Sequence, residues 1–128
     1  MVIVDTSVVV KWIAEEEGSL EAKSLLQGTD MGAPDLLLYE FVNVLNCRPG
    51  FSEADVEISL NSLFNFKLQF FVLPQHQFLK INQLCQKYKI TSYDASFVIL
   101  AETLGVDLIT ADKKMAQKVN HLKFVHLL

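Results

Sequence analysis

The sequence predicts a single α/β domain over residues 1–128, in which helices flank a central parallel sheet. Short apolar runs alternate with longer stretches whose apolar residues recur at helical spacing, a pattern typical of parallel βαβ units. The strand-like runs are apolar throughout, as expected of strands that are buried on both faces. A chain of 128 residues fits one domain, and a hydrophobic fraction of 51% supplies a packed core.

The predicted strands are short and rich in Val, Ile and other apolar residues. The first, Val-Ile-Val, ends at Asp5, and a similar run through Thr110 leads to Asp112. Runs of this length between helical stretches favour strands over helices. In chain order, we expect strands over residues 2–4, 31–33, 69–73, 106–110 and 123–127.

The predicted helices begin at residues that cap helices and end at residues that break them. Ser, Thr and Pro are favoured at the start of a helix, and Gly is favoured after its last turn. Ser52 followed by Asp55 is a variant of the capping box. The expected helices run from a cap at Thr6 or Ser7 to Ala14, from Ser19 to Leu26, from about Asp35 (after Pro34) to Asn46, from Ser52 to about Phe66, from Pro74 to about Tyr88, from Ser92 to Leu104, and briefly after Asp112.

Composition argues against several classes of protein. No apolar run reaches the roughly 18–20 residues that cross a bilayer, and no secretory signal opens the chain, so we expect a cytoplasmic protein. Cys47 and Cys85 form no CxxC pair, which argues against a zinc site or a disulfide framework. The net charge of −4 argues against a nucleic-acid partner, unless several of the acids bind cations.

Two acids follow predicted strands. Asp5 and Asp112 each come directly after an apolar strand and near a hydroxyl residue. Because ligands of open α/β sheets bind at the carboxyl ends of strands, both acids are expected to face a crevice. The alternative is a simple helix cap, a position that Asp favours. Since Thr6 or Ser7 can cap the first helix, Asp5 is not needed for that purpose.

Two further acids lie on predicted helices. Glu40 lies on a helix that is apolar almost all round and is therefore expected to be buried, where a carboxylate needs a cation or donors. Asn43 shares its face and is placed to orient it or to contact a water. The alternative is a partly exposed Glu on a polar stripe. Asp94 lies in the first turn of its helix, where the helix dipole alone also favours an acid.

These four acids are expected to converge on one crevice. Carboxylates packed together repel one another and stay ionised only if a cation compensates their charge. Oxygen ligands select Mg²⁺ or Mn²⁺ over zinc, and such a site can activate water against a phosphodiester. The histidines are scattered, no thiol–histidine pair is evident, and no GxxxxGK[ST] loop is present.

Four segments of the chain resemble a known family. Val-Asp-Thr-Ser at 4–7, Tyr-Glu-Phe-Val-Asn at 39–43, Tyr-Asp-Ala at 93–95 and Leu-Ile-Thr-Ala-Asp at 108–112 are similar to the PIN domain. They are closest to the VapC toxins of prokaryotic toxin–antitoxin pairs. The resemblance spans nearly the whole chain in the order and spacing of the family.

The resemblance implies a five-stranded parallel sheet and metal-dependent endonucleolytic cleavage of RNA. It also implies a homodimer and inhibition by a small antitoxin protein that occupies the acidic groove. Carried over by position, the acidic constellation that holds the metal is Asp5, Glu40, Asp94 and Asp112. Thr6 and Thr110 are then hydroxyl helpers, and Asn43 supports Glu40.

Three lysines are candidates for contacts with RNA phosphates, namely Lys11, Lys113 and Lys114. For the basic run near the C-terminus, a solvated helix face is the alternative. Many relatives carry arginines near the motifs, whereas this chain has only Arg48. This difference leaves the four acids intact and leaves the choice of substrate open.

Three alternative functions are weighed against the nuclease. A phosphoacceptor receiver domain needs an acidic pair after the first strand, and Asp5 stands alone there. A haloacid-dehalogenase-type phosphatase needs a second Asp two residues further on, where Ser7 lies instead. The more serious alternative is a PIN-like RNA- or protein-binding module with weak or no catalytic activity.

Overall fold

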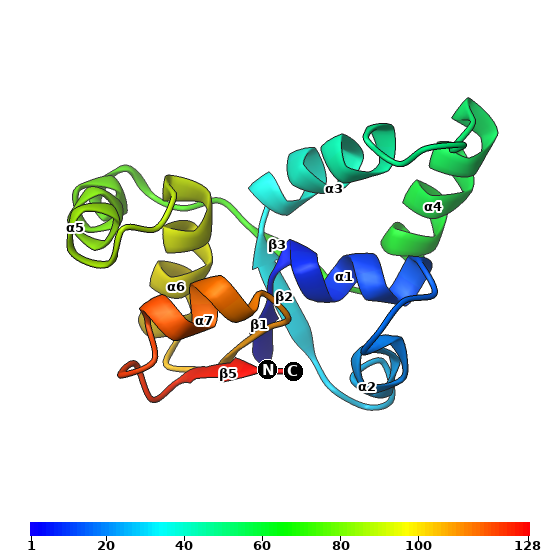
Figure 1. Ribbon diagram of the computed structural model, residues 1–128. Coiled ribbons are helices and arrows are strands. Elements are labelled where there is room, and N and C mark those ends of the chain that lie inside the picture. The colour runs from blue at the N-terminus through cyan, green and yellow to red at the C-terminus, as the bar shows by residue number, and fades with distance from the viewer.

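The computed structural model, which describes residues 1–128, has one parallel sheet at its centre (Figure 1). Its five strands follow the order β3-β2-β1-β4-β5, and every neighbouring pair is parallel. This confirms the predicted α/β class and the parallel sheet. The strands are β1 (Val2–Val4), β2 (Met31–Pro34), β3 (Gln69–Phe71), β4 (Leu108–Thr110) and β5 (Val125–Leu127).

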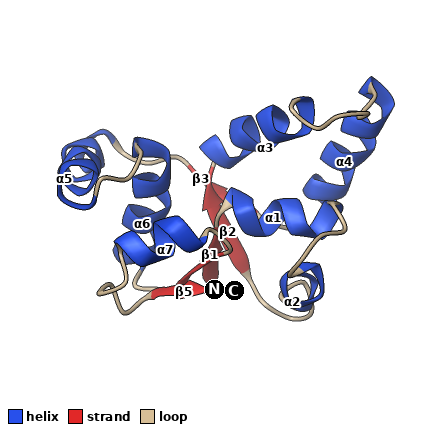
Figure 2. Cartoon of the chain, viewed as in Figure 1, coloured by secondary structure: helices blue, strands red, loops and turns tan.

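Helices cover both faces of this sheet. In Figure 2, helices α1 to α4 lie to the right of the strands and α5 to α7 to the left. On one face α6 packs against β1, β2 and β4, while α1 packs against β4 and against α2, α3 and α4. The helices are α1 (Thr6–Ile13), α2 (Ser19–Ser24), α3 (Leu36–Asn46), α4 (Glu53–Asn65), a 3₁₀ turn η1 (Gln75–Gln77), α5 (Phe78–Tyr88), α6 (Ser92–Leu104) and α7 (Lys113–Lys118). None of them combines the length and apolar character needed to cross a membrane.

The core lies between the sheet and its two covering layers. Helix α6 is buried along the whole stretch 95–101, which explains why its sequence is almost uniformly apolar. On the other face, the indole N–H of Trp12 donates to the carbonyl of Ala22 at 2.8 Å. Its ring meets Phe66 edge-on, with 5.2 Å between the centroids. Trp12 therefore joins α1 to α2 and to the end of α4.

Three predicted helix caps were wrong by one or two residues. Asp5, Gly18 and Thr91 occupy the cap positions, in place of Thr6 or Ser7, Ser19 and Ser92. Asp5 and Thr91 have extended backbones, so each side chain can accept a hydrogen bond from the N–H three residues later, in the first turn of the helix. The capping box of Ser52 and Asp55 is confirmed, because both of its hydrogen bonds are present.

Several predicted boundaries also differ from the structure. Pro34 ends β2 instead of opening the next helix, and Pro74 precedes the turn η1 before α5 begins. The predicted strands over 69–73, 106–110 and 123–127 are each shorter, because their outer residues belong to loops that enter or leave the sheet. These differences do not change the order of the elements.

Candidate active site

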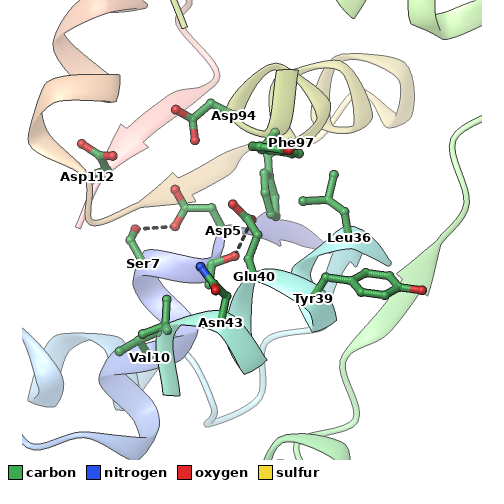
Figure 3. Close-up of a pocket in the computed structure, with 13 residues that line it drawn as sticks. Asp5, Ser7, Val10, Leu36, Tyr39, Glu40, Asn43, Asp94, Phe97 and Asp112 are labelled. Atoms are coloured by element: carbon green, nitrogen blue, oxygen red, sulfur yellow. Dashed lines mark hydrogen bonds between the residues drawn. The ribbon is translucent and has the colours of Figure 1, made fainter. Parts of the chain in front are cut away.

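A groove of about 650 Å³ lies beside the carboxyl ends of β1 and β4. All four predicted acids line it: Asp5, Glu40, Asp94 and Asp112 (Figure 3). The chain runs from β1 outward to β2 and β3, then returns to place β4 on the other side of β1. The groove therefore lies where the strand order reverses, the usual ligand site of an open α/β sheet.

Asp5 is the most buried of these acids, with only 5% of its surface exposed. Its Oδ1 accepts hydrogen bonds from the Ser7 hydroxyl at 2.5 Å and from the Val8 N–H at 3.3 Å, and its Oδ2 accepts from Thr110. Burial raises the pKa of Asp5 to about 6, although these three hydrogen bonds oppose the shift. Asp5 is thus a fixed carboxylate whose charge is poorly solvated.

Two hydroxyls tie the end of β1 to the end of β4. Ser7 Oγ accepts from the N–H of Ala111 at 2.8 Å while it donates to Asp5, and Thr110 Oγ1 accepts from the N–H of Asp112 at 3.0 Å. Thr110, predicted as a helper, is fully buried. Ser7 was missed, because its position two residues after Asp5 was interpreted as a helix cap.

Glu40 faces the groove from α3 and is held by Thr6, whose hydroxyl donates to Oε1 at 2.8 Å. Burial raises the pKa of Glu40, the Thr6 bond opposes this, and the charge of Asp94 raises it further. Asn43 lies one turn along and lines the groove, but no hydrogen bond joins it to Glu40.

The prediction that α3 is buried all round was wrong. Only Leu37, Phe41 and Leu45 of this helix are buried, and Tyr39 is 79% exposed. The helix contacts α1 and α4, and Leu36, Leu38 and Val44 are only partly buried against the core. Glu40 is accordingly half-buried.

Asp94 and Asp112 approach from the opposite wall of the groove. Asp94 lies in the first turn of α6, and burial and the charge of Asp112 raise its pKa, against smaller effects of Thr91 and Lys118. Asp112 is exposed and caps α7, where its Oδ1 accepts from the N–H of Met115 at 3.0 Å. Asp112 therefore combines the two roles that the sequence left as alternatives, because it caps a helix and also lines the groove.

The sequence matches the model of the PIN domain family over residues 2–120. This chain belongs to the PIN domain family. The family that the sequence motifs indicated is therefore confirmed.

Individual relatives agree with this assignment. Ribonuclease VapC3 of Pyrobaculum aerophilum is 32% identical over 124 residues, which cover 91% of this PIN domain chain and 92% of the relative. A toxin–antitoxin complex from Klebsiella pneumoniae has a similar fold, with a TM-score of 0.76 at 13% identity over 98% of this chain and 96% of that one. VapC20 of Mycobacterium tuberculosis, a sarcin–ricin loop cleaving toxin, gives a TM-score of 0.74 at 13% identity, covering 93% and 95% of the two chains.

The chemistry of the groove of this PIN domain suits a hard cation. Burial and mutual repulsion raise the pKa of Asp5, Glu40 and Asp94, and no basic side chain lines the groove to compensate their charge. Carboxylate and hydroxyl oxygens are donors that Mg²⁺ and Mn²⁺ accept. As the side chains stand, no three of them are close enough to hold one ion. The types of donor in the groove suit a hard cation, although the carboxylates are not gathered around a single point.

The three lysines predicted to contact RNA lie outside this groove. The Lys11 ammonium binds the Glu16 carboxylate at 3.2 Å and donates to the Glu17 carbonyl at 2.6 Å, so the loop after α1 partly neutralises its charge. Lys113 and Lys114 are exposed in the first turn of α7, directly after Asp112. Of the three, Lys113 and Lys114 have the more favourable positions to contact a strand that enters the groove.

Proposed function

We propose that this PIN domain is a metal-dependent endoribonuclease and the toxin of a VapBC-type pair. The observation that carries the proposal is the convergence of four acids, from the ends of two strands and from two helices, on one groove. The similarity to ribonuclease VapC3 over nearly the whole chain supports RNA as the substrate.

In the proposed mechanism, Asp5, Glu40, Asp94 and Asp112 would hold one or two Mg²⁺ or Mn²⁺ ions. Once bound there, such ions would supply activation of water and compensation of negative charge. Ser7, Thr110 and the Val8 N–H keep the Asp5 carboxylate fixed, and Thr6 orients Glu40. These hydrogen bonds hold Asp5 and Glu40 in place before substrate arrives.

The proposed reaction is hydrolysis of a phosphodiester by in-line attack of water at phosphorus. The bond from phosphorus to the 3′-oxygen breaks, and that oxygen takes up a proton. The products carry 5′-phosphate and 3′-hydroxyl ends. Products with 2′,3′-cyclic phosphate would reject this mechanism, because they arise when the 2′-hydroxyl of the RNA attacks.

The first test is cleavage of a mixed RNA substrate with Mn²⁺, Mg²⁺ or EDTA. Asp5→Asn and Asp94→Asn should lose the metal-dependent cutting. Asp107→Asn is the matched control, since Asp107 precedes β4 at the other end of that strand and pairs with His126 at 3.3 Å, outside the groove. Equal activity of all variants would indicate a contaminating nuclease, and Mn²⁺ binding without any cleavage would favour the alternative, a binding module.

We also propose a small antitoxin protein as partner, and the similarity to a toxin–antitoxin complex supports it. An antitoxin encoded beside this chain should suppress its cleavage of RNA when the two are co-expressed.

We further propose a homodimer. Exposed apolar side chains that could form its interface lie close together in sequence after β3, namely Val72, Phe78 and Leu79. A double variant, Phe78→Ser with Leu79→Ser, should shift the mass measured by light scattering from dimer to monomer.

A further inference from the structure

The groove has an apolar side next to its carboxylates. In Figure 3, Ser7 and Asp112 lie on one side of Asp5, and Leu36 and Tyr39 lie on the other. Phe97, only 1% exposed, lines the groove from α6. The same cavity therefore combines an acidic side with an apolar side.

Two exposed tyrosines line this cavity from different helices. Tyr39 on α3 is 79% exposed and directly precedes Glu40, while Tyr93 on α6 is 59% exposed and directly precedes Asp94. Neither hydroxyl makes a hydrogen bond within the chain, and neither ring packs on another aromatic ring; the aromatic pairs involve Trp12 and Tyr88 instead. Both rings therefore remain largely exposed and make no aromatic contact within the chain.

The negative charge of the groove makes uncharged contacts, such as ring stacking, important for binding a nucleic-acid strand. Its lining includes four acids and no Lys, Arg or His. A polyanionic strand therefore gains no attraction from the side chains of the groove, apart from what bound cations provide. Stacking of a base on an aromatic side chain provides affinity without charge, and it requires a base that is not already paired in a duplex.

We infer that Tyr39 and Tyr93 are base-stacking residues that hold unpaired nucleobases of single-stranded RNA beside the carboxylate cluster. Leu36, which is only partly buried, provides an apolar contact next to them. This inference rests on the proposed nuclease function and adds residues that position the substrate. Because every base has a stacking face, these tyrosines select unpaired RNA with little preference for base identity.

The test compares Tyr39→Ala and Tyr93→Ala with the matching Phe variants, which keep the ring and lose only the hydroxyl. Cleavage of a short single-stranded RNA gives KM and kcat. Each Ala variant should raise KM by roughly 5- to 150-fold, which corresponds to about 1–3 kcal/mol per stacked base, and the Phe variants should stay near wild type. Phe64→Ala is the control for loss of an exposed aromatic ring, since Phe64 is also 59% exposed but lies on α4 outside the groove.

Substrates with one abasic nucleotide beside the cleavage position show whether the lost contact is to a base. The wild-type protein should lose affinity for such a substrate, whereas the Ala variant at the contacting tyrosine should show no further loss. Unchanged KM in both Ala variants, or equal sensitivity of wild type and Ala variants to the abasic position, would overturn the inference.

The two proposals fail in different ways. If the wild-type protein cuts RNA and the Ala variants match it, the stacking inference fails and the nuclease remains. If the wild-type protein cuts no RNA, the nuclease fails, and fluorescence anisotropy with a labelled single-stranded RNA then decides on stacking. Weaker binding by the Ala variants than by the Phe variants supports stacking, and equal binding overturns it.

Discussion

Replacing Asp5 with Asn should stabilise the metal-free protein at neutral pH while it abolishes function. The pKa of Asp5 is about 6, against 3.8 for an ordinary Asp. Since each pKa unit corresponds to about 1.4 kcal/mol, the charged carboxylate lowers the free energy of unfolding by about 3 kcal/mol above pH 6. Asp5 is only 5% exposed, so solvent screens this effect little. The Asn amide replaces one acceptor by a donor, which costs about 1 kcal/mol, and leaves a net gain of about 2 kcal/mol.

The effect should depend on pH with a definite sign. A raised pKa means that folded Asp5 binds its proton more tightly than unfolded Asp5 does. Its contribution to stability is therefore fully present below about pH 4 and is lost as the pH rises to about 6. At pH 7.5 the Asn variant should melt roughly 5–10 °C above wild type, and at pH 4 it should be no more stable than wild type.

The measurement is thermal and urea unfolding in EDTA at both pH values. Asp112→Asn is the matched control, because Asp112 is also a helix cap whose side chain accepts from the first turn, but it is exposed. Asn caps helices as well as Asp does, so this control should change stability little. If Asp5→Asn is instead less stable than wild type at pH 7.5 and the control is unchanged, the three hydrogen bonds outweigh burial, and the reasoning about an unfavourable buried charge is refuted.

Three further outcomes are expected. Mn²⁺ or Mg²⁺ at about 100 times its Kd should add about 2.7 kcal/mol to wild-type stability in a thermal shift assay, and little to Asp94→Asn; equal shifts would place the metal elsewhere. Thr110→Val removes a donor to buried Asp5 and should cost about 1–3 kcal/mol with a large loss of RNA cleavage, while Thr110→Ser should retain most of both. Gly32→Ala should destabilise the protein by about 1–3 kcal/mol in urea unfolding, because the new Cβ would lie 2.8 Å from the Phe71 ring; an unchanged midpoint would mean that the ring moves freely.

The sequence was sufficient to predict the parallel sheet and the places of Asp5 and Asp112 beside its carboxyl edge, because both depend on local patterns. Each of these two acids follows an apolar strand closely in sequence. Because parallel strands end at the same edge of the sheet, both acids are expected at that edge. The order β3-β2-β1-β4-β5, which places those two ends side by side, depends on long-range packing. The exposure of α3 likewise depends on which neighbours cover it, and an apolar sequence alone does not reveal this.

Single hydrogen bonds were harder to predict, and Ser7 shows why. A hydroxyl after a strand-end Asp suits a helix cap equally well, and the capping hypothesis accounted for it. In the structure Asp5 is itself the cap, so the Ser7 hydroxyl is free to bridge Asp5 and the N–H of Ala111. That bridge spans two segments of the chain 104 residues apart, and only the folded sheet brings them together.

A helix cap and the proposed metal ligand are compatible roles for one carboxylate. An ionised carboxylate has about four acceptor sites on two oxygens. In Asp112, Oδ1 accepts the capping N–H and Oδ2 is left free; in Glu40, Oε1 accepts from Thr6 and Oε2 is left free. Asp5 uses both oxygens, for three donors in all, and retains one acceptor site. Each of these carboxylates therefore keeps at least one acceptor site for a cation, so the hydrogen bonds do not compete with the proposed site.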